Sequence, residues 1–471
     1  MTPDEFRRLG HALVEWVARY RETMPGLPVM SRAAPGSIRA LLPPAPPEEG
    51  RPLDALLPLL DTVVMPGITH WNHPRFFAYF PSKTHLASVL ADLVSAGLGA
   101  QAMSWQTSPA ATEVEEVMMD WLRQLVGLPA DFTGVVHDTA STATLVALLC
   151  ARERRSGNAQ ERGGFQDGEP PLVVYTSEMA HSSVEKAALL AGFGRAHLRL
   201  LPTDAAHALL PGALEAAVQA DLAAGRRPAA VVATSGTTAT TAFDPVAAIA
   251  GLARRHGLWL HVDAAMAGTA MACPELRGLW SGVEGADSVV LNPHKWMGVG
   301  CDCSAYFVRD PAHLVSVMST HPSYLRTAAD AEVKNFRDWG IPLGRRFRAL
   351  KVWFVLHALG AEGIRAAVHR DLALARWLAD RVDAEPTWER CAPVPLQTVC
   401  LRHLLPGRPA AEVDAHNLAL AQAVNASGEA YVTPAVVKGV QLIRVSIGAL
   451  DTGPADVEAV WKLLRTTAAR L

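Results

Sequence analysis

A lysine and an aspartate each follow an apolar stretch that is typical of a buried strand. Lys295 lies in the turn Asn292-Pro-His-Lys-Trp296, directly after the apolar residues 288–291. Asp263 ends a second apolar stretch, which begins at residue 258. Because the carboxyl ends of neighbouring parallel strands meet at one edge of a sheet, we expect the acid and the amine to face one site.

This pair of groups suits the chemistry of pyridoxal phosphate. A lysine amine can form a Schiff base with the aldehyde of that cofactor, and a carboxylate that faces the ring nitrogen favours its protonated, electron-accepting form. An Asn-Pro-His-Lys turn on its own is most often only the exit of a strand. The prediction therefore depends on Asp263 and on the groups described next.

Residues 134–144 contain a candidate phosphate site, since they lead from an apolar strand into a helix expected over residues 145–152. Thr139, Ala140 and Ser141 would offer hydroxyl groups and free backbone N–H groups to a phosphate at the start of that helix. The alternative is an ordinary helix cap, because serine and threonine are common there. The position of this helix in the same sheet as Asp263 and Lys295 favours the phosphate interpretation.

Two further strand ends carry polar residues. His181 follows the apolar residues 172–175, and its imidazole could stack on a pyridine ring; the alternative is a purely structural histidine. Thr238 follows the apolar residues 230–233 and could reach the same cofactor, although it could also only terminate its strand.

The pattern along the chain predicts an α/β protein. Helical stretches alternate with six apolar runs that we expect to be buried parallel strands. The boundaries predict a helical arm over residues 1–80, a large domain over 81–360 and a smaller α+β domain over 361–471. Those six runs are residues 172–175, 197–201, 230–233, 258–262, 288–291 and 305–308.

The arm opens with a helix over residues 3–23 that has one apolar stripe. Phe6, Leu9, Leu13 and Trp16 recur at intervals of three and four residues. We expect this stripe to pack on a second copy of the chain, and the alternative is that it packs on its own chain.

The composition excludes several classes of partner. The formal net charge is −3, 19% of the residues are charged and 50% are hydrophobic, without a long basic run. This balance argues against a binder of nucleic acid or of a membrane surface and favours a small-molecule substrate. The six cysteines show no disulfide or metal spacing, so we expect buried thiols, no metal site and a cytoplasmic location.

The motifs together resemble the group II pyridoxal-phosphate decarboxylases, above all those that act on aromatic L-amino acids. The resemblance covers nearly the whole chain. Its motifs are Trp71-Asn-His-Pro-Arg-Phe-Phe-Ala-Tyr-Phe-Pro81, Ser108-Pro-Ala-Ala-Thr-Glu-Val-Glu115, Thr139-Ala-Ser-Thr-Ala-Thr144, Ala180-His-Ser-Ser-Val-Glu185, His261-Val-Asp-Ala-Ala265, Asn292-Pro-His-Lys-Trp296 and Ile341-Pro-Leu-Gly-Arg-Arg-Phe-Arg348.

The resemblance implies a fold and a site. It implies fold type I, with a mostly parallel seven-stranded sheet, in a homodimer whose active sites lie at the subunit interface. It makes Lys295 the Schiff-base lysine and Asp263 the partner of the ring nitrogen. The remaining roles are a ring-stacking imidazole (His181), a phosphate cradle (Thr139, Ala140, Ser141 and Asn292), further cofactor contacts (Thr238 and Ala265), a polar neighbour of the reacting carbon (His294), a substrate-side wall (Trp71, Tyr79, Phe80 and Pro81) and the acid that protonates the substrate carbon (Tyr324).

Three positions bear on the substrate. Gln101 and Met103 make one pocket wall more polar and more pliable than the apolar and Phe side chains of aromatic-specific relatives, whereas Gly344 leaves room for a large ring. The resemblance therefore implies decarboxylation of an aromatic L-amino acid to its amine. A decarboxylase of a non-aromatic amino acid and an oxygen-consuming aromatic aldehyde synthase remain alternatives. A degenerate protein without activity would be expected to lack Lys295, Asp263 or Tyr324.

Overall fold

The computed structural model describes residues 1–166, 168, 170–320 and 332–471. The chain forms two compact units. The larger unit contains residues 82–376 and 392–400, and the smaller unit contains residues 1–81, 377–391 and 401–471. The three-part division expected from the sequence, with boundaries after residues 80 and 360, stays a prediction.

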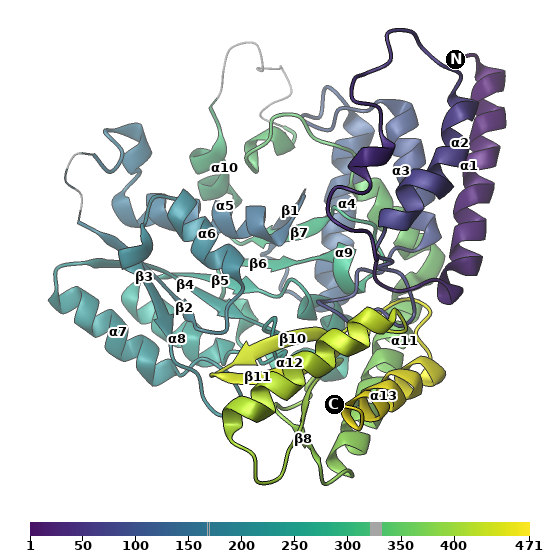
Figure 1. Cartoon of the computed structure of the whole chain (residues 1–471). Coiled ribbons are helices and arrows are strands. Elements are labelled where there is room, and N and C mark those ends of the chain that lie inside the picture. Colours follow the sequence, from purple (N-terminus) through teal and green to yellow (C-terminus); the bar gives the residue numbers. More distant parts are fainter. Residues whose placement is uncertain (167, 169, 321–331) are drawn as a thin grey trace. The chain divides into compact units, whose positions relative to one another are not determined.

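A seven-stranded sheet forms the centre of the larger unit (Figure 1). The strand order is β1-β7-β6-β5-β4-β2-β3, and the neighbours from β6 through β5, β4 and β2 to β3 run parallel. This arrangement confirms the mostly parallel sheet expected from the sequence. The strands are β1 (Thr133–His137), β2 (Leu172–Ser177), β3 (Leu198–Leu201), β4 (Arg227–Thr234), β5 (Trp259–Asp263), β6 (Ser288–Leu291) and β7 (Ser304–Val308).

Two of the six expected strands differ from the prediction of buried parallel strands. β7 runs antiparallel to both β1 and β6. An apolar run indicates burial but not direction, and the connection from β6 to β7 holds only the four-residue helix α9 (Pro293–Trp296), too little for a helical crossover. β3 lies at the edge of the sheet, where Leu200 is 60% exposed.

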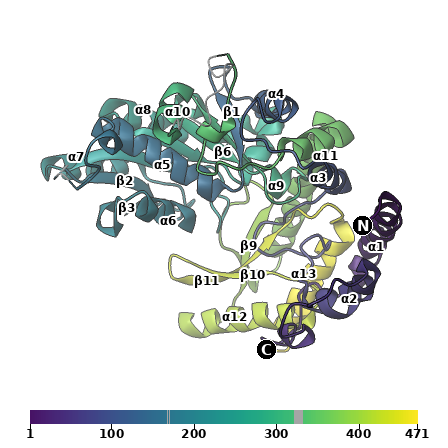
Figure 2. The ribbon, with the colours of Figure 1, turned by 90° about the horizontal axis from the view of Figure 1, so that it is seen from above.

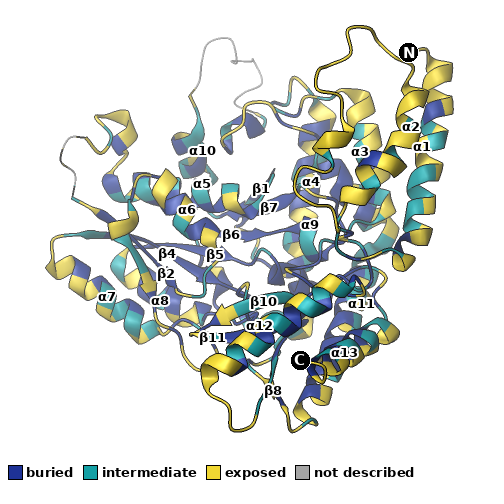
Figure 3. Ribbon diagram, in the orientation of Figure 1, coloured by how far each residue is buried: buried dark blue, intermediate teal, exposed yellow. Residues whose placement is uncertain are grey.

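Helices cover the sheet, and α5 lies across strands β4 to β7 (Figures 1 and 2). Small residues of α5 pack with Val174, Val232 and Val290 in one hydrophobic cluster. Except for the edge strand β3, the strands of this sheet are almost wholly buried (Figure 3). The remaining helices of this unit are α3 (Leu86–Leu98), α4 (Pro109–Val126), α5 (Ala140–Ser156), α6 (Ser182–Leu190), α7 (Pro211–Ala223), α8 (Val246–His256), α10 (Pro311–Met318) and α11 (Ala349–Asp383), the last of which ends in the smaller unit.

The smaller unit combines the two ends of the chain. Strand order β10-β11-β9-β8 defines a four-stranded sheet, whose strand β8 the sequence did not indicate. The amino-terminal part joins it through backbone hydrogen bonds from Val29 to Gly428 (2.9 Å) and from Phe77 to Tyr431 (2.8 Å). Its elements are α1 (Pro3–Thr23), α2 (Leu57–Leu59), β8 (Trp388–Arg390), β9 (Thr398–His403), α12 (Ala410–Ser427), β10 (Thr433–Val437), β11 (Val440–Ser446) and α13 (Pro454–Ala468).

The apolar stripe of α1 stays largely open to solvent in the single chain. Leu9 is buried, whereas Phe6 is 55% and Leu13 43% exposed.

Within the described residues, no helix is long and apolar enough to cross a membrane. All six cysteines are free, and the expectation that they are buried is wrong for Cys301, which is exposed.

Three histidines of the larger unit are buried as neutral rings. His261 Nδ1 lies 2.9 Å from Ser288 Oγ, and His137 Nε2 lies 3.0 Å from the carbonyl oxygen of Trp339. Burial lowers the pKa of His137, His261 and His294 to about 4 in each case. These rings therefore stay uncharged at any pH where the protein is expected to work.

The buried histidines predict that acid destabilises the fold. An unfolded histidine titrates near its ordinary pKa of about 6.5, so between that pH and about 4 the unfolded chain binds more protons than the folded one. Each ring then removes about 1.4 kcal/mol of unfolding free energy per pH unit. Asp244, whose pKa burial raises to about 6, acts in the opposite direction but is a single group. We expect a lower urea midpoint at pH 5 than at pH 7; equal midpoints would contradict this account.

Candidate active site

The carboxyl ends of β5 and β6 place an acid beside an amine. β5 ends on Asp263, and Asp263 pairs in parallel register with Val290 of β6. The ladder continues past both strands, since the backbone N–H of Asn292 donates to the carbonyl of Ala265 at 2.9 Å. Three residues beyond Asn292, Lys295 lies in the single turn of α9. The sequence expectation of one shared edge therefore agrees with the structure.

The surroundings of these two groups shape their charges. Asp263 is buried, and one of its carboxylate oxygens accepts the backbone N–H of Ala265 at 3.0 Å. Burial lowers the pKa of the Lys295 amine, and the negative charge of Asp263 offsets part of that effect. A lowered pKa increases the fraction of the neutral amine, which is the form that attacks an aldehyde.

His181 belongs to the same group of side chains. It caps the amino terminus of α6, where its Nδ1 accepts the backbone N–H of Ser183 at 3.1 Å. Nδ1 therefore acts as an acceptor and the proton of the neutral ring lies on Nε2. Burial lowers the pKa of the His181 ring. The charge of Asp263 raises this pKa and the charge of Lys295 lowers it, so both charges act on the imidazole. The residue as a whole is still exposed.

The start of α5 offers free donors. The helix begins at Ala140, five residues earlier than expected, with Thr139 as its cap: Thr139 Oγ1 accepts the N–H of Thr142 at 3.4 Å. The backbone N–H groups of Ala140 and Ser141 have no acceptor among the residues that the structure describes. Unpaired N–H groups at a helix start favour a phosphate.

The other expected cofactor contacts lie on strand ends of the same sheet. Asn292 is buried, and its Oδ1 accepts the hydroxyl of Ser304 at 2.5 Å, which fixes the orientation of its amide. His294 accepts the N–H of Cys303 through Nδ1 at 3.0 Å. Thr238 is exposed beyond the end of β4, and Ala265 is half-buried beyond β5.

The positions expected to line the substrate pocket fall into two groups. In the larger unit, Gln101 Oε1 accepts the backbone N–H of Arg345 at 2.6 Å, and a Cβ at Gly344 would lie 3.4 Å from Gln101 Nε2. Met103, two residues after Gln101, is half-buried. Its backbone carbonyl accepts the N–H of Arg337 at 2.8 Å. Gln101 and Gly344 are therefore direct neighbours.

The second group lies in the smaller unit. Trp71 stacks on Tyr79 with ring centroids 5.5 Å apart, and Tyr79 meets Tyr431 edge to face at 6.0 Å. Phe80 and Pro81 are buried, and the Arg444 guanidinium lies over the Phe80 ring at 5.3 Å. Sequence reasoning missed Tyr431 in this aromatic cluster. Tyr324 lies outside the described residues.

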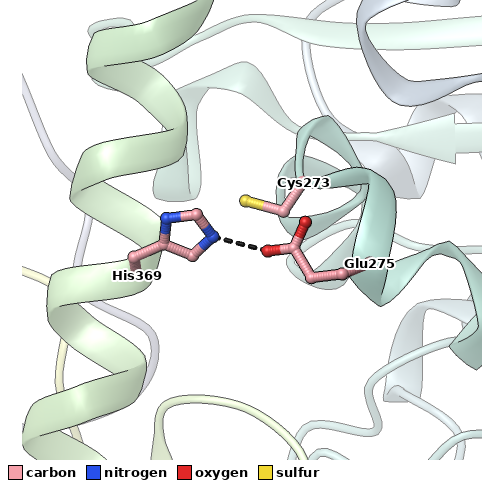
Figure 4. A group of neighbouring side chains, drawn as sticks. All are labelled: Cys273, Glu275 and His369. Atoms are coloured by element: carbon pink, nitrogen blue, oxygen red, sulfur yellow. Dashed lines mark hydrogen bonds and ion pairs between the residues drawn. The ribbon is translucent and has the colours of Figure 1, made fainter.

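One further group of side chains has metal-ligand chemistry (Figure 4). Nε2 of His369 lies 2.5 Å from a carboxylate oxygen of Glu275, beside the buried thiol of Cys273. Burial raises the pKa of that thiol to about 11, and the charge of Arg365 lies close to both Cys273 and Glu275. We interpret the group as a surface pair beside a protonated thiol.

Comparison with known proteins identifies the family. Residues 35–404 match the pyridoxal-dependent decarboxylase conserved domain. The chain belongs to the pyridoxal-dependent decarboxylases. Its cofactor is therefore pyridoxal phosphate, and it is a carboxy-lyase.

Individual relatives span the whole chain. A phenylacetaldehyde synthase of Arabidopsis thaliana is 39% identical over 100% of this chain and 97% of its own length. An aromatic-L-amino-acid decarboxylase of Bos taurus is 38% identical over 100% and 97%. The crystal structure of Oryza sativa TDC with PLP and tryptamine superposes with a TM-score of 0.97 at 35% identity and covers 100% of this chain and 99% of that one.

The residues of this decarboxylase fit the cofactor. A buried carboxylate that uses one oxygen for a single backbone N–H can still pair with a protonated ring nitrogen. The unpaired N–H groups of Ala140 and Ser141 suit its phosphate, and the Lys295 amine suits its aldehyde. The donor set and its charges thus match the group that the family requires.

The role of Asp263 can be tested by replacing only its charge. We expect Asp263→Asn to fold and to lose well over tenfold in turnover, because an amide does not hold the ring nitrogen in its protonated form and each pK unit lost is worth about 1.4 kcal/mol. Steady-state turnover, with circular dichroism as a check of folding, measures this. A loss smaller than about tenfold would show that Asp263 faces another group.

Proposed function

We propose that this decarboxylase converts an aromatic L-amino acid, of the tryptophan, 5-hydroxytryptophan, DOPA, tyrosine or phenylalanine type, into the corresponding amine and carbon dioxide. The observation that supports the assignment of the site is that Asp263 and Lys295 both follow the carboxyl ends of the parallel strands β5 and β6, and that the charge of Asp263 acts on the Lys295 amine. The charges of both residues also act on His181.

Four residues of the chain are proposed to bind the cofactor. Pyridoxal phosphate, when bound, supplies an aromatic ring that accepts the electron pair released with carbon dioxide. Lys295 would hold that group covalently until substrate amine replaces it. Asp263 keeps the ring nitrogen protonated, and the free N–H groups of Ala140 and Ser141 hold the phosphate.

Two neutral imidazoles complete the polar surroundings of the proposed reaction. His181 would lie flat against the cofactor ring, with its Nδ1 held by Ser183 and its Nε2 proton free to donate. His294 has a pKa of about 4 because it is buried, so its imidazole is uncharged and its Nε2 proton is available for a hydrogen bond. Neither ring adds a positive charge that would compete with the protonated cofactor.

Tyr324 is proposed as the acid that returns a proton to the substrate carbon. A phenol has an ordinary pKa near 10, so it is protonated at neutral pH and can donate. Fast protonation would direct the reaction to the amine.

The aromatic preference rests on the relatives and on Gly344. The relatives that span the chain include enzymes named for tyrosine, for tryptophan and for aromatic L-amino acids. Gly344 has no side chain, and even a Cβ there would lie 3.4 Å from the Gln101 amide, so the glycine keeps this position as open as a residue can. Gln101 supports the alternative that the substrate is a non-aromatic amino acid, since its Nε2 can donate a hydrogen bond to a polar substrate side chain.

An aldehyde synthase is the second candidate activity. The phenylacetaldehyde synthase of Arabidopsis thaliana is a relative over the full chain. Tyr324 favours the amine-forming reaction, because a phenol can protonate the reacting carbon before dioxygen attacks it.

We also propose that the chain works as a cytoplasmic homodimer without nucleic-acid or membrane partners. Support for a second copy comes from large apolar side chains that are exposed in the first 70 residues, among them Phe6, Leu13, Leu56 and Ile68. A soluble monomer rarely leaves so many apolar groups in water.

Replacing Tyr324 tests both the proposed reaction and its alternative. We expect the wild type to form amine and carbon dioxide from an aromatic amino acid without oxygen uptake. Tyr324→Phe keeps the ring but removes its proton, so the reacting carbon is exposed to dioxygen for longer. This variant should lose amine formation and gain aldehyde, ammonia and hydrogen peroxide, measured with an oxygen electrode and product analysis.

Ser323→Ala is the matched control, since it alters the adjacent residue and leaves the phenol in place. Amine formation by Tyr324→Phe at the wild-type rate would assign the protonation to another acid, with His294 the nearest candidate. Activity of the wild type on non-aromatic amino acids alone would overturn the proposed substrate class.

A further inference from the structure

A single buried carboxylate anchors the two residues that flank the backbone of Lys295. We propose that Asp371 of α11 is a positioning residue: through Lys83 and Trp296 it holds the turn from which the Lys295 amine extends. The inference rests on the proposed role of Lys295. It adds a long-range contact that the motifs around Lys295 do not contain.

The carboxylate of Asp371 is fully used and fully buried. One oxygen, Oδ2, accepts the ammonium of Lys83 at 2.6 Å and the indole N–H of Trp296 at 2.7 Å. The other oxygen, Oδ1, accepts Nε and Nη2 of Arg370 at 3.1 and 2.9 Å. The side chain of Asp371 is 0% exposed and that of Lys83 is 1% exposed. Four hydrogen bonds therefore fix one group between two segments of the larger unit.

Both direct partners of Oδ2 reach the backbone of Lys295. Trp296 is its neighbour in sequence. The backbone N–H of Lys83 donates to the carbonyl oxygen of Lys295 at 3.1 Å, and the hydroxyl of Ser82, one residue earlier, donates to the carbonyl oxygen of His294 at 2.6 Å. Residues 82–83 therefore contact the α9 turn through hydrogen bonds, and Trp296 belongs to that turn. Asp371 binds both Lys83 and Trp296.

The turn itself has little stability of its own. α9 contains only four residues, and a single helical turn fixes many dihedral angles for very few internal hydrogen bonds. Its position must therefore come from tertiary contacts. The contacts from Ser82, Lys83 and Asp371 supply them on the side of α11.

A purely stabilising role explains the ion pair poorly. Burial lowers the pKa of Lys83, and the charge of Asp371 opposes that effect, so both groups have lost hydration to form the pair. Well-packed apolar side chains often stabilise such a position equally well or better. An apolar pair could not fix the orientation of these groups. Only a carboxylate at Asp371 can accept Lys83 and Trp296 on one oxygen and Arg370 on the other.

The test compares the holoenzyme with Asp371→Asn and with Trp296→Phe. Trp296→Phe keeps an aromatic side chain and the buried ion pair, and it removes the indole N–H together with part of the bicyclic ring. We expect both variants to retain the cofactor on Lys295 after borohydride reduction. A misplaced turn alters the orientation of the bound cofactor, so its visible circular dichroism per bound cofactor should change. Turnover should fall about tenfold or more with little change in KM, because small displacements of a reacting group are costly.

Two further variants separate positioning from stability. Asp221→Asn breaks another buried carboxylate network, in which Asp221 accepts Arg199 at 2.6 Å and Tyr175 at 2.9 Å, on α7 at the far flank of the sheet from α9 (Figures 1 and 2). It should unfold at a lower temperature and keep the visible spectrum. The double variant Lys83→Met with Asp371→Leu removes both buried charges of the pair, and the only charge that loses its partner is that of Arg370, which is 39% exposed. This variant should still resemble Asp371→Asn in its spectrum and turnover.

Wild-type visible circular dichroism and turnover in both Trp296→Phe and the double variant would overturn the inference. If Asp371→Asn does not fold, the same two measurements on Trp296→Phe decide whether Asp371 positions the turn. Labelling of a lysine other than Lys295 in the wild type would instead contradict the proposed function. The two failures are therefore distinct.

Discussion

The electrostatic pairing of a buried carboxylate with a buried amine, on the ends of two adjacent parallel strands, is the constraint on which the site depends. Burial lowers the pKa of the Lys295 amine, and the negative charge of Asp263 offsets part of that effect. Parallel pairing of β5 with β6 brings them to one edge. The same edge receives His181 and the open N–H groups of α5, because β2 and β1 end in helices there.

The side chains around Asp263 and Lys295 are polar, but several of them are uncharged. The imidazoles of His261 and His294 are buried and neutral, and Asn292 is oriented by Ser304. Asp371, far from these residues in sequence, joins the site only through the backbone of the Lys295 turn. A rigid sheet thus supplies the acid, and a short turn that depends on tertiary contacts supplies the amine.

Much of this arrangement could be predicted from local sequence. The apolar runs before Asp263 and Lys295 are short, continuous and followed by polar residues, which is the signature of buried parallel strands. The direction of β7 could not be predicted, because burial of residues 305–308 is the same for either direction. The start of α5 was placed too late although Thr139 carried the capping signal. β8 has only three residues and no periodicity. The contacts of Asp371 with Lys83 and of Gly344 with Gln101 join distant segments, and no local pattern encodes such pairs.

Peptide mapping of the holoenzyme after borohydride reduction tests the central claim most directly. The larger unit contains two other buried lysines. Lys83 is bound to Asp371, and Lys351 donates to the carbonyl oxygens of Gly300 and Asp302 at 3.0 and 3.1 Å. Only Lys295 combines a lowered pKa with a facing carboxylate on the neighbouring strand. We expect the reduced cofactor on Lys295 alone. Its recovery on Lys83 or Lys351, or the absence of any covalent adduct, would contradict the account.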